Sequence, residues 1–274
     1  MLKLLMQSAA TIESAVNSLG MHFPAPRAVE LKGVTAFRHD KQDDLLMSYL
    51  KCVRGVSLLH AAIVLSGYGF YQEVGILCRC LSEAVEDVMF LATPLGENKS
   101  PSKQQDQLVQ EFFVEEFEDP SKPAAGQTAR HRVPRNAVLA GIARIEGNPL
   151  NPNDSKAFQQ LLHKGYSGYV HGAYVHTMEL FGAPPNAEGK PDANAGKFYM
   201  RGGMPPARTG EMVEALEARA ELLAVAVSIV AKRIGDAAVV DALKPVIDAL
   251  AKKTGTIADI NTAAKAVKAG KSFP

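Results

Sequence analysis

Two long apolar segments that lie almost end to end constrain the fold of this chain more than any other feature. Residues 43–67, DDLLMSYLKCVRGVSLLHAAIVLSG, repeat apolar side chains with helical periodicity and open with two aspartates, which favour the positive end of a helix dipole. Residues 70–92, FYQEVGILCRCLSEAVEDVMFLA, form a second such segment that ends before Thr93-Pro94. Because glycines mark the short connection between them, the sequence predicts an antiparallel pair of helices.

Most of the remaining chain is also helical in pattern and is joined by polar loops. Further helices are expected at residues 1–20, 105–119, 135–145, 154–182, 211–234, 236–252 and 258–270, with Asp154 and Ser155 capping the fourth of these. The tetrapeptide KFYM (197–200), in the Pro- and Gly-rich segment 183–208, is the one strand fragment expected. The sequence therefore predicts an all-α fold, an antiparallel helical bundle in a single domain over residues 1–274. Its core spans about residues 41–236, and helical additions cover 1–20 and 237–270.

Charge and cysteine content narrow the classes of partner and compartment. The 30 Lys and Arg side chains nearly balance the 29 Asp and Glu, so no strong overall field attracts nucleic acid or a membrane surface. The longest apolar stretch without a charge, 56–72, is 17 residues long and short for a membrane span. Cys52, Cys78 and Cys80 lie in apolar helical sequence and form no disulfide framework. We expect reduced, buried thiols in a cytoplasmic protein that makes no membrane contact.

Residues 163–181, HKGYSGYVHGAYVHTMELF, gather three tyrosines and three histidines in one helical segment. On a continuous helix, Tyr166 and Tyr174 belong to one stripe and His171 lies on the neighbouring stripe. The glycines at 165, 168 and 172 each cost a helix interior about 0.5–1 kcal/mol relative to alanine. They therefore indicate a kink or the close approach of another helix or a ligand. This segment is the best candidate for a site, facing the bundle interior or a dimer groove.

Several common chemistries lack their sequence signatures. His171 and His176 are five residues apart, whereas helical zinc pairs are four apart, and the Glu-x-x-His pairs of di-iron bundles are missing. Ser167 lacks the G-x-S-x-G elbow of a hydrolase, and the chain has no Gly-rich phosphate loop or dinucleotide fingerprint. No metal and no cofactor are therefore predicted, although a metal enzyme remains a third alternative.

Two stretches carry a resemblance to a known superfamily. CRCLSEAVEDVMFLA, with Arg79 and Glu83 one helical turn apart, resembles the Arg-x-x-x-Glu helix of bacterial helical proteins of unknown function. YSGYVHG resembles the tyrosine- and serine-rich run ending in histidine that follows in those proteins, which are similar to the HEPN superfamily. The resemblance covers residues 41–182. It implies a homodimeric or otherwise homo-oligomeric bundle that acts in defence or stress, as a metal-independent ribonuclease or toxin, or as a non-catalytic RNA-binding or scaffold protein.

A ribonuclease of this kind implies roles for particular residues. His171 would be the acid or base, because histidine titrates near neutral pH, and the RNA 2′-hydroxyl would be the nucleophile. Arg79, beside Glu83, or Lys164 would hold the phosphate, and Tyr166 or Tyr174 would form hydrogen bonds or stack on bases. We expect the side chains of Arg79, Glu83, Tyr166 and His171 to converge on one pocket.

Simpler interpretations stand beside each of these predictions. Arg79 and Glu83 also fit an i, i+4 ion pair within a helix. The superfamily's Arg-x4–6-His motif is missing upstream of His171 and occurs instead as Arg54-GVSLL-His60. The basic ARHRVPR segment, with Arg130, Arg132 and Arg135, fits either a phosphate contact or a solvated loop within 118–134. The alternative function is a non-catalytic helical module that binds a protein or small ligand in the same groove.

Overall fold

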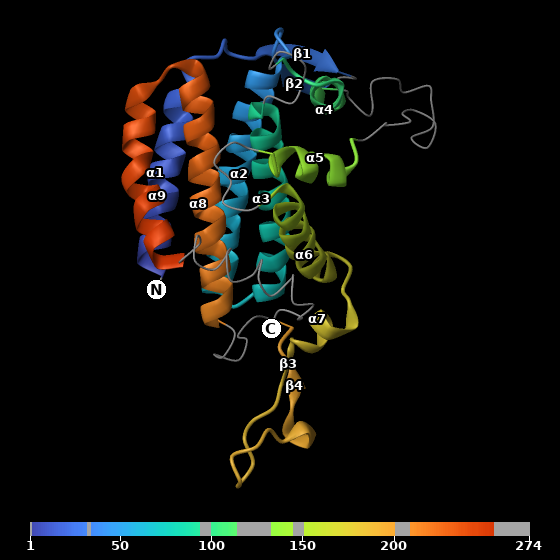
Figure 1. Cartoon of the computed structure of the whole chain (residues 1–274). Helices are drawn as coiled ribbons and strands as arrows, with labels where there is room; N and C mark the ends of the chain where they lie inside the picture. Colours follow the sequence, from blue (N-terminus) through green and yellow to red (C-terminus); the bar gives the residue numbers. More distant parts are fainter. Residues whose placement is uncertain are drawn as a thin grey trace.

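The computed structural model describes residues 2–31, 34–93, 100–113, 133–144, 151–200 and 209–254. It confirms the predicted all-α bundle (Figure 1). The helices are α1 (Leu2–Gly20), α2 (Asp44–Gly67), α3 (Tyr71–Ala92), α4 (Lys103–Phe113), α5 (Arg135–Ile142), α6 (Pro152–Val170), α7 (Tyr174–Met178), α8 (Thr209–Ile234) and α9 (Ala237–Thr254).

The helix pair α2–α3 forms as predicted, with the predicted start and end signals. The Asp43 side chain accepts a hydrogen bond of 2.8 Å from the backbone N–H of Leu46 and so caps α2. After Gly67 the chain turns through Gly69, whose φ of +79° is a left-handed conformation that glycine adopts without steric cost. α3 ends at Ala92, immediately before Thr93. Local sequence signals therefore determine both ends of this hairpin.

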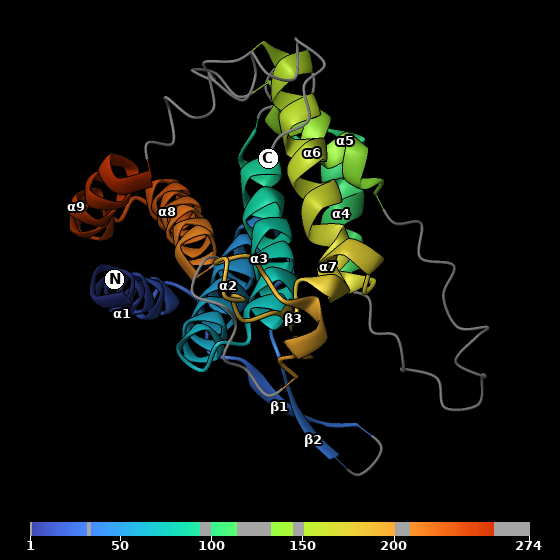
Figure 2. The same ribbon diagram turned by 90° about the horizontal axis from the view of Figure 1, so that it is seen from below.

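α3 is the central helix of the molecule. Seen from the end of the bundle, α1, α2, α8 and α9 lie on one side of it, and α4, α5 and α6 lie on the other (Figure 2). The larger hydrophobic core lies on the first side and includes the fully buried Leu59, Leu81 and Leu223. α1 and α9 contribute Leu5, Ile12, Leu243 and Leu250 to this same core. The described helices at both chain ends therefore pack into the bundle core, while the helix expected at 258–270 lies outside the described residues.

A second, smaller core joins α5 to α3 and is bordered by an ion-pair network. Phe90, Val138 and Ile142 are buried in it. Next to them, Arg135 donates to Asp87 at 2.6 Å and, through Nε, to Glu86 at 2.8 Å. Lys51 of α2 lies 2.7 Å from the other oxygen of Asp87. Thus Arg135, one of the three basic residues predicted to contact phosphate or solvent, instead pairs with carboxylates; Arg130 and Arg132 lie outside the described residues.

The strands are short, and one pair of them was not expected from the sequence. β3 (Phe181–Gly182) pairs antiparallel with β4 (Lys197–Phe198), which covers the first half of the expected KFYM fragment. β1 (Arg27–Leu31) and β2 (Val34–Arg38) form a second antiparallel pair, with Arg27 opposite Arg38 and Leu31 opposite Val34. The expectation of a single strand fragment was therefore wrong. The β-branched and aromatic residues of RAVEL and VTAFR were the missed signal.

The helix expected at 154–182 starts earlier and is interrupted. Its cap is Asn151, whose side chain accepts from the backbone N–H groups of Asn153 and Asp154 at 3.1 and 3.0 Å, so the prediction of Asp154 and Ser155 was wrong. α6 ends at Val170, because Gly172 adopts a φ of +58° that cannot continue a right-handed helix. The chain then starts the short helix α7, so faces drawn on an unbroken helix do not hold beyond residue 170.

Among the described residues, α2 is the one helix long and apolar enough to cross a membrane. In this structure it contacts α1, α3 and α8, and its buried face, with Met47, Cys52 and Leu59, is part of the bundle core.

Candidate functional site

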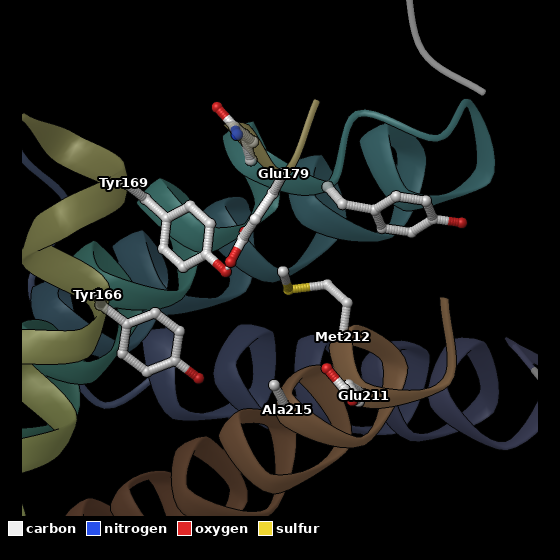
Figure 3. Close-up of a pocket in the computed structure, with 8 residues that line it drawn as sticks. Tyr166, Tyr169, Glu179, Glu211, Met212 and Ala215 are labelled. Atoms are coloured by element: carbon white, nitrogen blue, oxygen red, sulfur yellow. Dashed lines mark hydrogen bonds between the residues drawn. The ribbon is translucent and has the colours of Figure 1, made fainter. Parts of the chain in front are cut away.

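The candidate site is a cavity of about 140 Å³ near one end of the bundle, between α3, α6 with α7, and α8 (Figure 3). It is lined by Tyr71 and Gln72 of α3, Tyr166 and Tyr169 of α6, Glu179 after α7, and Glu211, Met212 and Ala215 of α8. These residues come from three separate parts of the sequence. The Tyr166 and Tyr169 rings and the Glu179 side chain point into the space between α6 and α8 (Figure 3).

The contact of α6 with α3 depends on a glycine. A Cβ atom on Gly75 would lie 2.8 Å from Cγ of Tyr169, closer than real Cβ contacts come. The missing side chain therefore lets the Tyr169 ring lie against the α3 backbone. From there its hydroxyl donates to Oε2 of Glu179 at 3.0 Å. Tyr169 thus links α3 to the segment that follows α7.

The break after α6 brings Glu179 into the cavity wall. α7 folds back so that the His176 ring occupies the space beside Gly168, where a Cβ would lie 2.1 Å from Cε1 of the ring. The same ring meets the edge of Tyr169 with centroids 4.3 Å apart. The side-chain amide of Gln72 donates to the carbonyl of His176. Gly168 is therefore one of the close approaches that the clustered glycines predicted.

A buried arginine lies behind the cavity. The guanidinium carbon of Arg219 is 5.1 Å from the centroid of the Tyr166 ring, within the range of a cation–π contact. Arg219 is 7% exposed, its Nε has no hydrogen-bond partner, and no carboxylate of the described residues forms an ion pair with it. Burial raises the pKa of Tyr166, and the positive charge of Arg219 partly offsets that rise. Burial also raises the pKa of the neighbouring Cys78 thiol to about 11.

The lining has a definite chemical character. Its described residues include two carboxylates, three tyrosines, an amide and a thioether, and include no lysine, arginine or histidine. Most of these polar groups can accept a hydrogen bond, whereas few can donate one. The cavity therefore suits a ligand that donates hydrogen bonds and presents some apolar surface.

Of the residues predicted from the sequence, Tyr166 lines this cavity and the Arg79–Glu83 pair lies further along α3. Arg79 Nε donates to Glu83 at 2.8 Å, as expected for an i, i+4 ion pair. Tyr169 packs on Gly75 and Tyr166 lies near Cys78, so α6 runs antiparallel to α3. Glu83 is eight residues beyond Gly75, a distance of about 12 Å along the helix.

The structure does not bring His171 to that pair. His171 follows the last residue of α6, is exposed, and lies past Tyr169 in the direction away from Glu83. Tyr174 is 79% exposed and Lys164 is also exposed. The expected convergence of four side chains therefore does not form, because the helix that was to carry His171 inward ends at Val170. The roles assigned to these residues in RNA chemistry stay predictions.

Two further predictions from the sequence concern other parts of the molecule. In the Arg54-x5-His60 match, His60 Nε2 lies 3.0 Å from Glu13 of α1, and Arg54 is exposed. For metals, no group of three or more His, Cys, Asp or Glu side chains in the described part of the chain is placed to hold an ion.

The sequence analysis missed most of the cavity. Glu179, Glu211 and Met212 lie in segments without a motif. Arg219 did have a signal, because it falls on the apolar stripe of α8 that includes Leu216, Ala220 and Leu223, where a charged side chain must be buried.

Comparison of the chain with protein-family models, with curated proteins and with solved structures returned no match.

Proposed function

We propose that this protein is a helical ligand-binding protein and that its site is the tyrosine-lined cavity. The observation that carries the proposal is the cavity itself, into which α3, α6 and α8 direct polar and aromatic side chains. Binding pockets commonly combine an apolar, aromatic lining with a few polar groups that orient the ligand. The cavity also ends at a buried arginine that no described carboxylate neutralises.

Its size limits the ligand. A cavity of about 150 Å³ holds a molecule as large as benzene, so about 140 Å³ suits roughly six heavy atoms or the end of a longer molecule. Binding rather than catalysis is the better interpretation, because His171 and His176 do not line the cavity. The described lining therefore lacks the usual acid–base residue of a catalytic site.

Three small molecules of matched shape test the proposal: n-butylammonium, n-butanol and butyrate. Binding of any of them should raise the melting temperature and shift the NMR signals of residues around Tyr166 and Tyr169. Ala215→Leu, which fills the cavity, should abolish these changes, whereas Ala242→Leu on the exposed face of α9 should not. If none of the three molecules changes either measurement at about 100 mM, the proposed function is wrong.

A second candidate function is contact with RNA, in line with the HEPN-like resemblance. The supporting observation is that Tyr174, His171 and Lys164 are all exposed, so an aromatic face, an imidazole and an ammonium group are accessible to a single strand. Incubation with RNA in EDTA should then show binding or cleavage that His171→Ala and Tyr174→Ala reduce. His60→Ala is the control for the alternative motif. Neither binding nor cleavage by the wild-type protein would eliminate this candidate.

A further inference from the structure

We propose that the ligand of the cavity is a small organic cation, an alkylammonium group held by Glu179, Glu211 and the tyrosines. This inference rests on the proposed ligand-binding function and specifies its chemistry. Two carboxylates line the cavity directly, and no cationic side chain is among its described lining residues. Arg219 lies behind Tyr166 rather than in the lining, so the charges around the cavity sum to one negative charge.

The hydrogen-bonding groups favour the same class of ligand. Glu179 already accepts from the Tyr169 hydroxyl at 3.0 Å, and a carboxylate offers about four acceptor sites. Gln72 donates its side-chain amide to the His176 carbonyl, which leaves an amide oxygen as its acceptor toward the cavity. An ammonium group has three donors and no acceptor, so it matches a wall of carboxylate, amide and hydroxyl oxygens.

The apolar part of the lining suits the alkyl chain. Tyr71, Tyr166 and Tyr169 provide aromatic surface, and the Met212 thioether lies in the wall of α8 (Figure 3). Aromatic faces also attract ammonium ions within about 6 Å of the ring centroid. Arg219 already uses one side of the Tyr166 ring in this way.

The two carboxylates hold different positions. Glu211 is exposed, so salt in solution screens its charge. Glu179 is partly buried and is oriented by Tyr169, so its charge acts in a less polar environment. Glu179 should therefore contribute more to cation affinity than Glu211.

The experiment measures the dissociation constants of n-butylammonium, n-butanol and butyrate by NMR titration of the whole chain. We expect n-butylammonium to bind at least about tenfold more tightly than the other two. Glu179→Gln should weaken its binding about tenfold and Glu211→Gln by a smaller factor. Asp248→Asn, which removes a charge on the exposed face of α9, should leave it unchanged. Arg219→Met should strengthen it several-fold, because it removes the opposing positive charge.

The outcomes separate the two proposals. If n-butanol or butyrate binds as tightly as n-butylammonium, the cation assignment is wrong and the ligand-binding function stands. If no probe binds, both are wrong. An unchanged affinity in Glu179→Gln places the cation outside this cavity and also overturns the assignment. Since Arg219→Met and Glu179→Gln should change affinity in opposite directions, general misfolding cannot imitate the expected result.

Discussion

The guanidinium carbon of Arg219 lies 5.1 Å from the centroid of the Tyr166 ring, and Arg219 is 7% exposed. The two residues form the wall between the bundle core and the cavity. A buried charge costs several kcal/mol unless it is paired, whereas a desolvated cation–π contact returns about 2 kcal/mol. This position is therefore shaped by something other than stability, which the ligand proposed above would explain.

Replacing the buried charge should stabilise the protein. Arg219→Met keeps much of the side-chain volume and removes the desolvation cost, so we expect the free energy of unfolding to rise by about 1 kcal/mol or more. Arg233→Met is the control, because Arg233 forms a partly exposed ion pair with Asp44 and should change stability by less than about 1 kcal/mol. Urea unfolding of both variants measures the difference. A clear loss of stability in Arg219→Met would show that Arg219 is a structural cation.

The contact of α6 with α3 predicts opposite effects for two glycine substitutions. Gly75→Ala places a Cβ against the Tyr169 ring, and we expect a net loss of about 1 kcal/mol despite the better helix propensity of alanine. Gly67→Ala, at the end of α2, meets no atom within 4 Å and should be neutral or stabilising. Denaturation midpoints of the two variants test this pair. Equal effects would mean that Tyr169 does not pack on Gly75.

The two arginine ion pairs on α3 should differ in strength. Arg135→Ala leaves Glu86 and the buried Asp87 without their shared partner and should cost about 2–3 kcal/mol. Arg79→Ala removes a helix ion pair whose Glu83 side chain is 41% exposed, and should cost about 0.5 kcal/mol. Urea unfolding compares them directly. A larger cost at Arg79 would indicate that this pair belongs to a buried site after all.

The buried thiols predict how stability changes at alkaline pH. Burial raises the pKa of Cys52 to about 12 and that of Cys78 to about 11. Above about pH 9 an unfolded chain releases these thiol protons while the native protein keeps them, so the free energy of unfolding falls as pH rises. The decline should be less steep in Cys52→Ala, by up to about 1.4 kcal/mol per pH unit between pH 9 and 12. Parallel pH profiles for the variant and the wild-type protein would contradict the burial of this thiol.

The ends of α2 and α3 could be predicted because their signals are local. Asp43 caps α2 through its own side chain, and the turn at Gly69 needs only a glycine. α6 was harder to predict, because the residues around Gly172 allow either a continued helix or a break. Packing of the His176 ring beside Gly168 favours the break, and that contact depends on how the chain folds back.

By itself the sequence determined the helical class, the α2–α3 hairpin and the presence of Tyr166 in a polar aromatic cluster, because periodicity and capping act over a few residues. Only the tertiary structure decided which side chains surround the cavity. Glu179, Glu211 and Arg219 lie far apart in the sequence from Tyr71 and meet it through packing between helices. His171 moved out of the expected site for the same reason: where a helix ends decides which way its last side chains point.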